Sequence, residues 1–135
     1  MADDPRRASF LPAPHMFNLQ QACHTLQAAF NAGGIYLVGS CLVKREYRDV
    51  DVRCILPDEE FDRLFPKCPS NRYLHPLWCV MCSTISLWLS QHTDLPIDFQ
   101  IQSMTEANKL YPTAEEHRRN FLGLFVFETR EESDG

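Results

Sequence analysis

Two aspartates whose spacing indicates metal chemistry, Asp49 and Asp51, lie in the segment Arg-Asp-Val-Asp-Val-Arg at positions 48–53. Side chains two positions apart in a β-strand point to the same side, so a strand here would direct both carboxylates at one point. The two valines would face the opposite side and be buried. Because carboxylates and substrate phosphate oxygens together hold hard cations such as Mg²⁺, this spacing predicts a metal and phosphate site.

A glycine-serine pair and a third acid extend this pattern. Gly39-Ser40 ends an apolar segment shortly before the acids, and Asp98 lies in Leu-Pro-Ile-Asp-Phe-Gln-Ile at positions 95–101. Glycine lets the backbone approach a ligand closely, and backbone amides with a hydroxyl bind phosphate oxygens. Apolar residues at 97, 99 and 101 predict a strand with Asp98 on its polar face. Together these residues predict metal-dependent phosphoryl or nucleotidyl transfer.

The elements that must position these residues follow from the hydrophobic period and from the turn residues. Apolar residues at helical spacing predict a first helix that begins at Phe17, and Gly33-Gly34 would end it. Acids at 58–60 oppose the dipole at the start of another helix favourably. The predicted elements, in order, are a helix over 17–30, strands over 35–38 and 48–56, helices over 58–65 and 76–91, and a strand over 97–102.

The remaining chain is predicted to complete one domain. Thr113-Ala-Glu-Glu116 matches a capping box and predicts a helix that ends near Gly123, with an edge strand over 124–127. The order of elements predicts an α+β fold, a small mixed sheet with helices packed mainly on one face. We expect a flexible arm over 1–16, which contains three prolines, a domain over 17–127, and a charged tail over 128–135.

Composition restricts the class of protein. The chain has 135 residues, of which 44% are hydrophobic and 23% charged, as in a soluble globular domain. A net charge of -5 is unfavourable for general nucleic-acid binding. The N-terminus has no apolar core of a secretory signal, and the most apolar stretch, 77–89, is too short to span a bilayer. We therefore expect a cytoplasmic protein without membrane association, whose six cysteines are thiols.

The strand that ends in Gly39-Ser40, the Asp49-x-Asp51 strand and the later Asp98 resemble the nucleotidyltransferase superfamily of the polymerase-beta type. The resemblance covers roughly residues 17–102 and is nearest to small single-domain nucleotidyltransferase-like proteins of actinobacteria and their phages. Those proteins share the Arg-Asp-Val-Asp-Val-Arg strand, the Leu-Pro-Ile-Asp-Phe-Gln-Ile-Gln strand and the Ala-Asn at 107–108. The resemblance implies the nucleotidyltransferase fold.

The same resemblance implies roles for the site residues. Gly39 and Ser40 would contact the β- and γ-phosphates of a nucleoside triphosphate such as ATP. Asp49 and Asp51 would bind two Mg²⁺ (or Mn²⁺) ions, and Asp98 would complete one metal site and help to activate the attacking hydroxyl. The implied reaction moves a nucleoside monophosphate to a hydroxyl acceptor by a two-metal mechanism. The acceptor stays open among a protein side chain, a small molecule and an RNA end.

Basic residues near these motifs have two interpretations. Lys44 and Arg48 are candidates for nucleotide contacts, and Arg48 is also placed to pair with an acid. Exposed surface is the plainer interpretation for the other polar residues that were considered for contacts with phosphate or base. These are Arg45 and Arg53 at a solvated strand edge, and Arg118, Arg119 and Asn120 on the face of the C-terminal helix.

Two other classes of function stay open. The segment Cys41-Leu42-Val43 is apolar where many superfamily members carry a polar, glycine-containing helix. This departure leaves the triphosphate contacts open, and the alternative is a catalytically silent nucleotide-binding or protein-interaction module, such as an antitoxin-like protein or a phage accessory factor. Cysteine and histidine spacing also permits a zinc-stabilised domain, but its apolar surroundings favour buried thiols. The residues concerned are Cys68, His75, Cys79 and Cys82.

Overall fold

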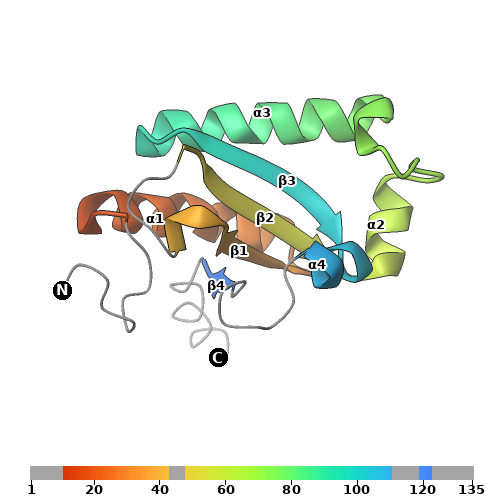
Figure 1. Ribbon diagram of the computed structural model, residues 1–135, viewed down its shortest axis with the longest axis horizontal. Coiled ribbons are helices and arrows are strands. Elements are labelled where there is room, and N and C mark those ends of the chain that lie inside the picture. Colours follow the sequence, from red (N-terminus) through yellow and green to blue (C-terminus); the bar gives the residue numbers. More distant parts are fainter. Residues whose placement is uncertain (1–10, 43–47, 111–118, 123–135) are drawn as a thin grey trace, which may run out of the picture.

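Within the residues that the structure describes, four strands form one mixed sheet in the order β3-β2-β1-β4 (Figure 1). The computed structural model describes residues 11–42, 48–110 and 119–122. Strand β1 is antiparallel to both β2 and β4, whereas β2 and β3 are parallel. The predicted α+β class with a small mixed sheet is therefore confirmed. The strands are β1 (Gly34–Val38), β2 (Val50–Leu56), β3 (Ile97–Ser103) and β4 (Asn120–Phe121).

Two long helices, α1 (Ala13–Ala29) and α3 (Pro76–Thr93), pack against each other and against the sheet. Alternate apolar residues of three strands are buried with them in one core, because side chains of a strand alternate between its two faces. The opposite face of β2 and β3 is left for the polar residues of these strands. The core includes Leu19, Cys23, Ile35, Leu37, Val50, Val52, Trp78, Leu89, Phe99 and Ile101.

Helix α1 begins four residues before the predicted start, so the expected arm over 1–16 is too long. Pro12 occupies the cap position, and Pro14 lies in the first turn of the helix. Proline is tolerated there because the first helical N–H groups have no partner within the helix in any case. The prolines that indicate an arm in the sequence therefore start a helix. Residues 1–10 lie outside the described residues.

The crossover between the parallel strands consists of α2 (Asp58–Leu64), a loop and α3. Both helices lie where the sequence predicts them, and the loop ends in a short 3-10 turn, η2 (Arg72–Leu74). The Nδ1 atom of His75 accepts a hydrogen bond from the backbone N–H of Trp78 at 3.3 Å and so caps α3. Parallel strands need a connection of this length, and a helix usually provides it.

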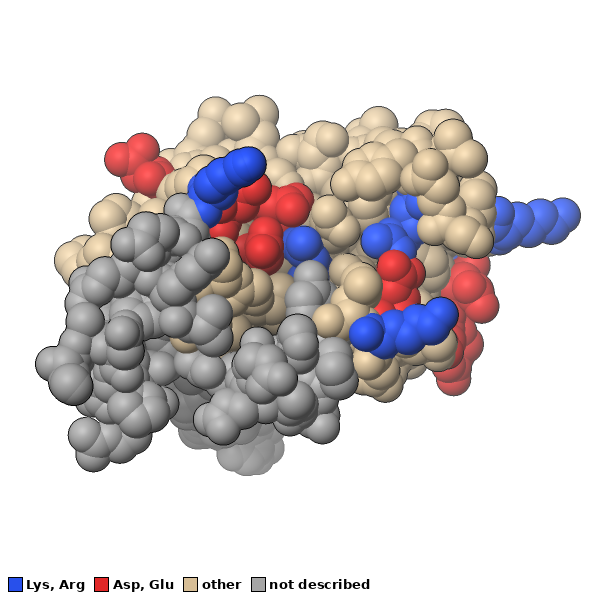
Figure 2. All heavy atoms as spheres, viewed as in Figure 1, with Lys and Arg blue, Asp and Glu red and all other residues tan. Residues whose placement is uncertain are grey.

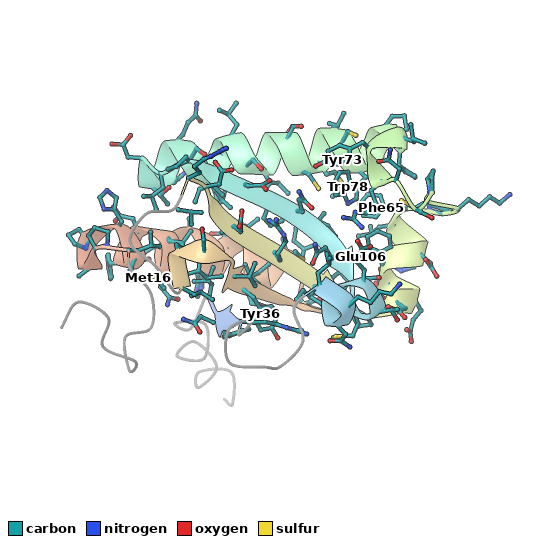
Figure 3. All side chains as sticks on the ribbon, viewed as in Figure 1. Met16, Tyr36, Phe65, Tyr73, Trp78 and Glu106 are labelled. Carbon is teal, nitrogen blue, oxygen red and sulfur yellow. The ribbon has the colours of Figure 1, made fainter. Side chains whose placement is uncertain are left out.

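Aromatic side chains join the loop to the start of α3 (Figure 3). The ring of Tyr73 meets the ring of Trp78 edge to face, with centroids 5.3 Å apart. The ring of Phe65 meets the ring of His75, the residue that caps α3, with centroids 5.4 Å apart. Arg72 lies over the Trp78 ring at 5.2 Å and forms an ion pair with Glu106. These contacts hold the loop against the start of α3 and against Glu106.

The sequence interpretation missed α4 (Met104–Leu110) directly after β3. Its signal is the capping box formed by Ser103 and Glu106, and the backbone N–H of Glu106 donates to the Ser103 hydroxyl at 3.2 Å. The Asp58 carboxylate adds a tertiary cap, because it accepts a hydrogen bond from the Thr105 N–H at 3.0 Å. A helix of seven residues depends on such contacts more than on its own propensity.

The predicted helix from 113 to about 123 is wrong at its C-terminal end, where Asn120–Phe121 forms strand β4. The ring of Phe121 meets the Tyr36 ring at 5.6 Å, and the Leu122 N–H donates to the Ile35 carbonyl at 2.8 Å. Pairing with β1 is thus preferred over a further helical turn. The capping box at 113–116 and the predicted strand at 124–127 lie outside the described residues.

Candidate metal and nucleotide site

Asp51 and Asp98 are register partners on neighbouring parallel strands, β2 and β3. Both side chains lie on the sheet face opposite the core, because their sequence neighbours Val50, Val52 and Phe99 are buried in the core. Figure 2 shows acidic and basic side chains side by side near the middle of the visible surface. The structure therefore brings together two of the three acids that the sequence singled out.

The Gly39 turn lies directly against the Asp51 carboxylate. Gly39 has a φ of +88°, and a β-carbon at this position would be 2.3 Å from Oδ2 of Asp51. No other residue combines the left-handed backbone with this lack of side-chain volume. Ser40 follows at the start of a 3-10 turn, η1 (Ser40–Leu42), which the Leu42 N–H closes onto the Gly39 carbonyl at 3.1 Å.

Asp49 lies outside β2, which corrects the prediction of a strand that begins at position 48. Strand β1 ends where Val38 pairs with Asp51, and β3 begins where Ile97 pairs with Val50. Residues 48 and 49 therefore have no partner strand and form an exposed bend. Asp49 nevertheless lies close enough for its charge to act on the pKa of Asp51.

Arg53 is buried, which contradicts its interpretation as part of a solvated strand edge. Its exposed fraction is 6%, and it follows Asp51 on the same face of β2. Nη1 donates hydrogen bonds to the backbone carbonyls of Asp98 at 2.7 Å and Val52 at 3.1 Å. Nη2 lies 3.4 Å from Oδ2 of Asp98 and 3.9 Å from Oδ1 of Asp51. The guanidinium is thus a built-in cation between the two acids.

Burial raises the pKa of Asp51 above its ordinary value of 3.8. The Arg53 guanidinium opposes this shift, while the charges of Asp98 and Asp49 add to it. Burial also raises the pKa of the neighbouring Cys41 thiol to about 12, and the Asp51 carboxylate contributes. The site therefore has an excess of negative charge that a further cation would neutralise.

Carboxylates are the ligands that Mg²⁺ prefers, so the donor chemistry of the site fits this ion. The described residues contain no ready group of three or more His, Cys, Asp or Glu side chains placed around a common metal position. Mg²⁺ commonly takes only one or two protein carboxylates and completes its shell with water and substrate phosphates. Asp51 and Asp98 meet this smaller requirement.

The other candidate residues have different surroundings. Arg48 is exposed in the bend beside Asp49, and Lys44 lies outside the described residues. Of the residues considered for zinc, His75 caps α3 through its ring nitrogen and Cys79 donates its thiol hydrogen to the Tyr73 carbonyl at 3.3 Å. Cys82 is buried in the core. All six cysteines of the chain are free thiols.

Helix α3 lies along the edge of the sheet that β3 forms. The Ser86 hydroxyl accepts a hydrogen bond from the Phe99 N–H at 2.8 Å and donates to the Phe99 carbonyl at 3.3 Å. The Trp78 indole donates to the Ile101 carbonyl at 2.9 Å. These side chains occupy backbone groups that would otherwise recruit another strand. Their signal in the sequence is the four-residue spacing of positions 78, 82, 86 and 90 on one helix face.

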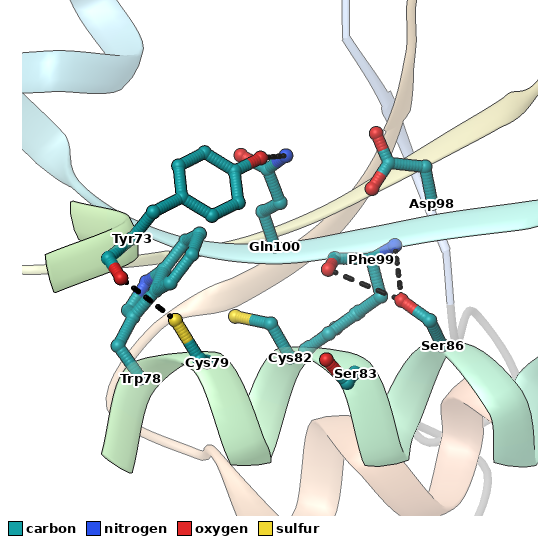
Figure 4. Close-up of a pocket in the computed structure, with 9 residues that line it drawn as sticks. All are labelled: Tyr73, Trp78, Cys79, Cys82, Ser83, Ser86, Asp98, Phe99 and Gln100. Atoms are coloured by element: carbon teal, nitrogen blue, oxygen red, sulfur yellow. Dashed lines mark hydrogen bonds between the residues drawn. The ribbon is translucent and has the colours of Figure 1, made fainter. Parts of the chain in front are cut away.

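A pocket of about 160 Å³ lies between α3 and β3, with Asp98 at one end (Figure 4). Nothing in the sequence analysis identifies it, because its walls come from the loop, the helix and the strand. Tyr73 lies at the opposite end from Asp98 (Figure 4). The lining residues are Tyr73, Trp78, Cys79, Cys82, Ser83, Ser86, Asp98, Phe99 and Gln100.

Among the described helices, none combines the length and the apolar character that crossing a membrane requires. Comparison of the chain with protein-family models, with curated proteins and with solved structures finds no match. A function for this chain is therefore inferred from the geometry of the site.

Proposed function

We propose that the chain has the nucleotidyltransferase fold and moves a nucleoside monophosphate from a nucleoside triphosphate to a hydroxyl acceptor in the cytoplasm. The observation that supports this most is the contact between the Gly39 turn and the Asp51 carboxylate, which itself lies opposite Asp98. Phosphates held by the turn would lie beside two carboxylates. Nucleotide phosphates and Mg²⁺ are bound together in such surroundings.

In the proposed step the acceptor oxygen forms a bond to the α-phosphorus, and the bond from this phosphorus to the bridging oxygen breaks. Pyrophosphate leaves with the electron pair of the broken bond, and the hydroxyl proton passes to the Asp98 carboxylate. The backbone at Gly39 and the Ser40 hydroxyl would hold the β- and γ-phosphates. Arg53 orients Asp98 through its two hydrogen bonds to that residue. Arg48, which is exposed in the bend beside Asp49, would contact the triphosphate.

Asp49, Asp51 and Asp98 would hold the two Mg²⁺ or Mn²⁺ ions of the proposed mechanism. When bound, such ions lower the pKa of the acceptor hydroxyl and neutralise charge on the departing pyrophosphate. The contribution of the chain is to keep the carboxylates ionised and aimed at one place. Arg53 serves this purpose, since it opposes the increase in the pKa of Asp51.

The position of Arg53 also favours a second candidate function. A guanidinium 3.4 Å from Asp98 and 3.9 Å from Asp51 supplies positive charge to both acids without a metal ion. A site of this kind can bind a nucleotide without turnover. The protein would then be a catalytically silent nucleotide-binding or protein-interaction module, such as an antitoxin-like protein or a phage accessory factor.

Nucleotide binding tests both candidates at once. We expect each nucleoside triphosphate, titrated with Mg²⁺ in a calorimeter, to give saturable heat, and the same ligands to raise the melting temperature. No binding at millimolar nucleotide and metal would contradict the proposed site. Asp62→Asn is the matched control for Asp51→Asn, because Asp62 is an exposed aspartate on α2.

Turnover separates the two candidates. The protein is incubated with triphosphate labelled in the α-phosphate, Mg²⁺ or Mn²⁺, and the separated protein, small-molecule and RNA fractions of a lysate. A transferase leaves label in one fraction, and Asp51→Asn abolishes this transfer whereas Asp62→Asn does not. Nucleotide binding without label transfer to any fraction would instead identify the silent module.

A further inference from the structure

The pocket between α3 and β3 is the cavity that continues from the proposed site. Asp98 belongs to both, since it lines the pocket and contacts Arg53. Its side chain is 41% exposed, so the carboxylate is accessible from the pocket. Figure 4 shows Asp98 and Tyr73 at opposite ends, with Ser83 and Ser86 on the helix below the strand. A molecule in the pocket would therefore lie next to the acid that receives the hydroxyl proton in the proposed reaction.

The charge of the lining selects against phosphorylated ligands. Among the described residues that line the pocket, Asp98 is the one with a formal charge, and none is a lysine or an arginine. Arg72 lies near, but it is held over the Trp78 ring and paired with Glu106. A phosphate group would meet the Asp98 carboxylate, whose nearest cation, Arg53, is already paired with it, whereas an uncharged group meets no such cost.

The polar groups of the lining suit an uncharged hydroxyl. Ser83 is exposed, and its hydroxyl makes no hydrogen bond with the described residues. The Gln100 amide makes one long bond of 3.4 Å, to the Tyr73 hydroxyl. Tyr73 itself is 66% exposed, so its ring offers an apolar surface beside these groups. One aromatic wall with neutral donors and acceptors is suited to a small polar organic molecule.

The size of the pocket limits what enters. Its volume of about 160 Å³ is below the roughly 300–1,000 Å³ of pockets that hold drug-sized ligands. We propose that this pocket binds an uncharged organic hydroxyl group, carried by a polyol or by an amino-acid side chain, and that this group is the acceptor. The assignment as acceptor rests on the proposed function, whereas the binding site itself does not.

Trp78 provides a reporter for the test, because it lines the pocket and the chain has 2 tryptophans. A Trp88→Phe background leaves Trp78 as the single tryptophan. Its emission is followed while the protein is titrated with glycerol, N-acetylserinamide and N-acetyltyrosinamide. Glycerol 3-phosphate and phosphorylated N-acetylserinamide are the charged counterparts. We expect a saturable change with at least one neutral probe, and at least about tenfold weaker binding of its charged counterpart.

Two variants of α3 show whether the pocket is responsible. Ser83→Leu places a larger side chain in the pocket, while Thr84→Leu makes a similar change at an exposed position that does not line it. We expect Ser83→Leu to weaken neutral-probe binding at least about tenfold and Thr84→Leu to leave it unchanged. The inference is overturned if no neutral probe binds, if charged probes bind as well, or if Ser83→Leu binds like the parent.

Nucleotide titration in the same protein separates this inference from the proposed function. Binding of triphosphate and Mg²⁺ without any binding of the neutral probes would overturn the pocket assignment alone. Binding of neutral probes without binding of nucleotide would uphold the pocket as a ligand site and overturn the transferase. Polyol and amino-acid probes are titrated separately, so the stronger binder identifies the source of the hydroxyl.

Discussion

The backbone of Gly39 lies so close to Asp51 that a β-carbon at position 39 would be 2.3 Å from the carboxylate oxygen Oδ2. This contact joins two motifs that are 12 positions apart in the chain, the turn after β1 and the acid of β2. The strand pairing places the turn there, because Val38, the residue before Gly39, is the register partner of Asp51 in the antiparallel pair. The turn after β1 and the acid of β2 therefore lie side by side in the proposed site.

Gly39→Ala is expected to lower the free energy of unfolding by about 1–3 kcal/mol, through backbone strain at a φ of +88° and the clash with Asp51. Urea unfolding measures this change. Nucleotide binding should be lost under conditions where the variant is still folded. Ser40→Ala is the matched control for the stability measurement alone, since it removes a hydroxyl at the next position without crowding the carboxylate. Unchanged stability of Gly39→Ala would contradict the close approach.

Arg53→Met is expected to lower the free energy of unfolding by about 3–5 kcal/mol, because it leaves Asp51 and Asp98 without their buried cation. Loss of the cation also raises the pKa of Asp51 further, so the defect should be smaller at pH 4 than at pH 8. Urea titrations at the two pH values measure this difference. The double variant Arg53→Met with Asp98→Asn should recover part of the loss. A defect that is equal at both pH values would argue for lost packing alone.

Asp51→Asn is expected to stabilise the free protein at neutral pH. Burial raises the pKa of Asp51 in the folded protein above its ordinary value of 3.8, so folding is opposed by the ionised carboxylate. This cost is absent below the unfolded pKa and develops as the pH rises through the folded pKa. The gain from the substitution should therefore vanish on acidification below about pH 4.

Thermal unfolding between pH 3 and pH 8 measures how much more stable Asp51→Asn is than the parent protein at each pH. Asp62→Asn is the control, because the same change at an exposed position should leave the pH profile as it is. Addition of Mg²⁺ should stabilise the parent protein and not Asp51→Asn. A variant that is less stable than the parent at neutral pH would show that the contact with Arg53 outweighs the cost of burial.

Ser86→Ala is expected to lower the free energy of unfolding by about 1–3 kcal/mol, since it leaves the Phe99 N–H without its partner at the edge of the sheet. It should also promote association through the uncovered edge of β3, which light scattering measures. Ser83→Ala makes the same chemical change three residues earlier, where the hydroxyl has no partner among the described residues. Equal behaviour of the two variants would contradict the capping role of Ser86.

Local sequence patterns were sufficient for the main elements. Alternation of apolar and polar residues predicted β3 within one residue, with Asp98 on its polar face, and helical spacing predicted α3 within two residues of its end. Both patterns arise because one face of the helix or strand must be buried, so the spacing of apolar residues along the chain indicates the element directly. The boundaries of α1 and the existence of α4 were missed, although Pro14 and the Ser103 to Glu106 capping box are local signals.

The sequence by itself determined strands β1, β2 and β3, the long helices and the chemical types in the candidate site. Only the tertiary structure decided that Arg53 is buried between two acids, that Asp49 lies outside β2, and that a pocket adjoins Asp98. The reason is physical. An alternating strand has the same sequence pattern whether its polar residues face solvent or a partner far away in the chain. Arg53 contacts Asp98, which is 45 positions away. Which of these occurs depends on which strands pair with β2, and the pattern of β2 alone does not identify its partners β1 and β3.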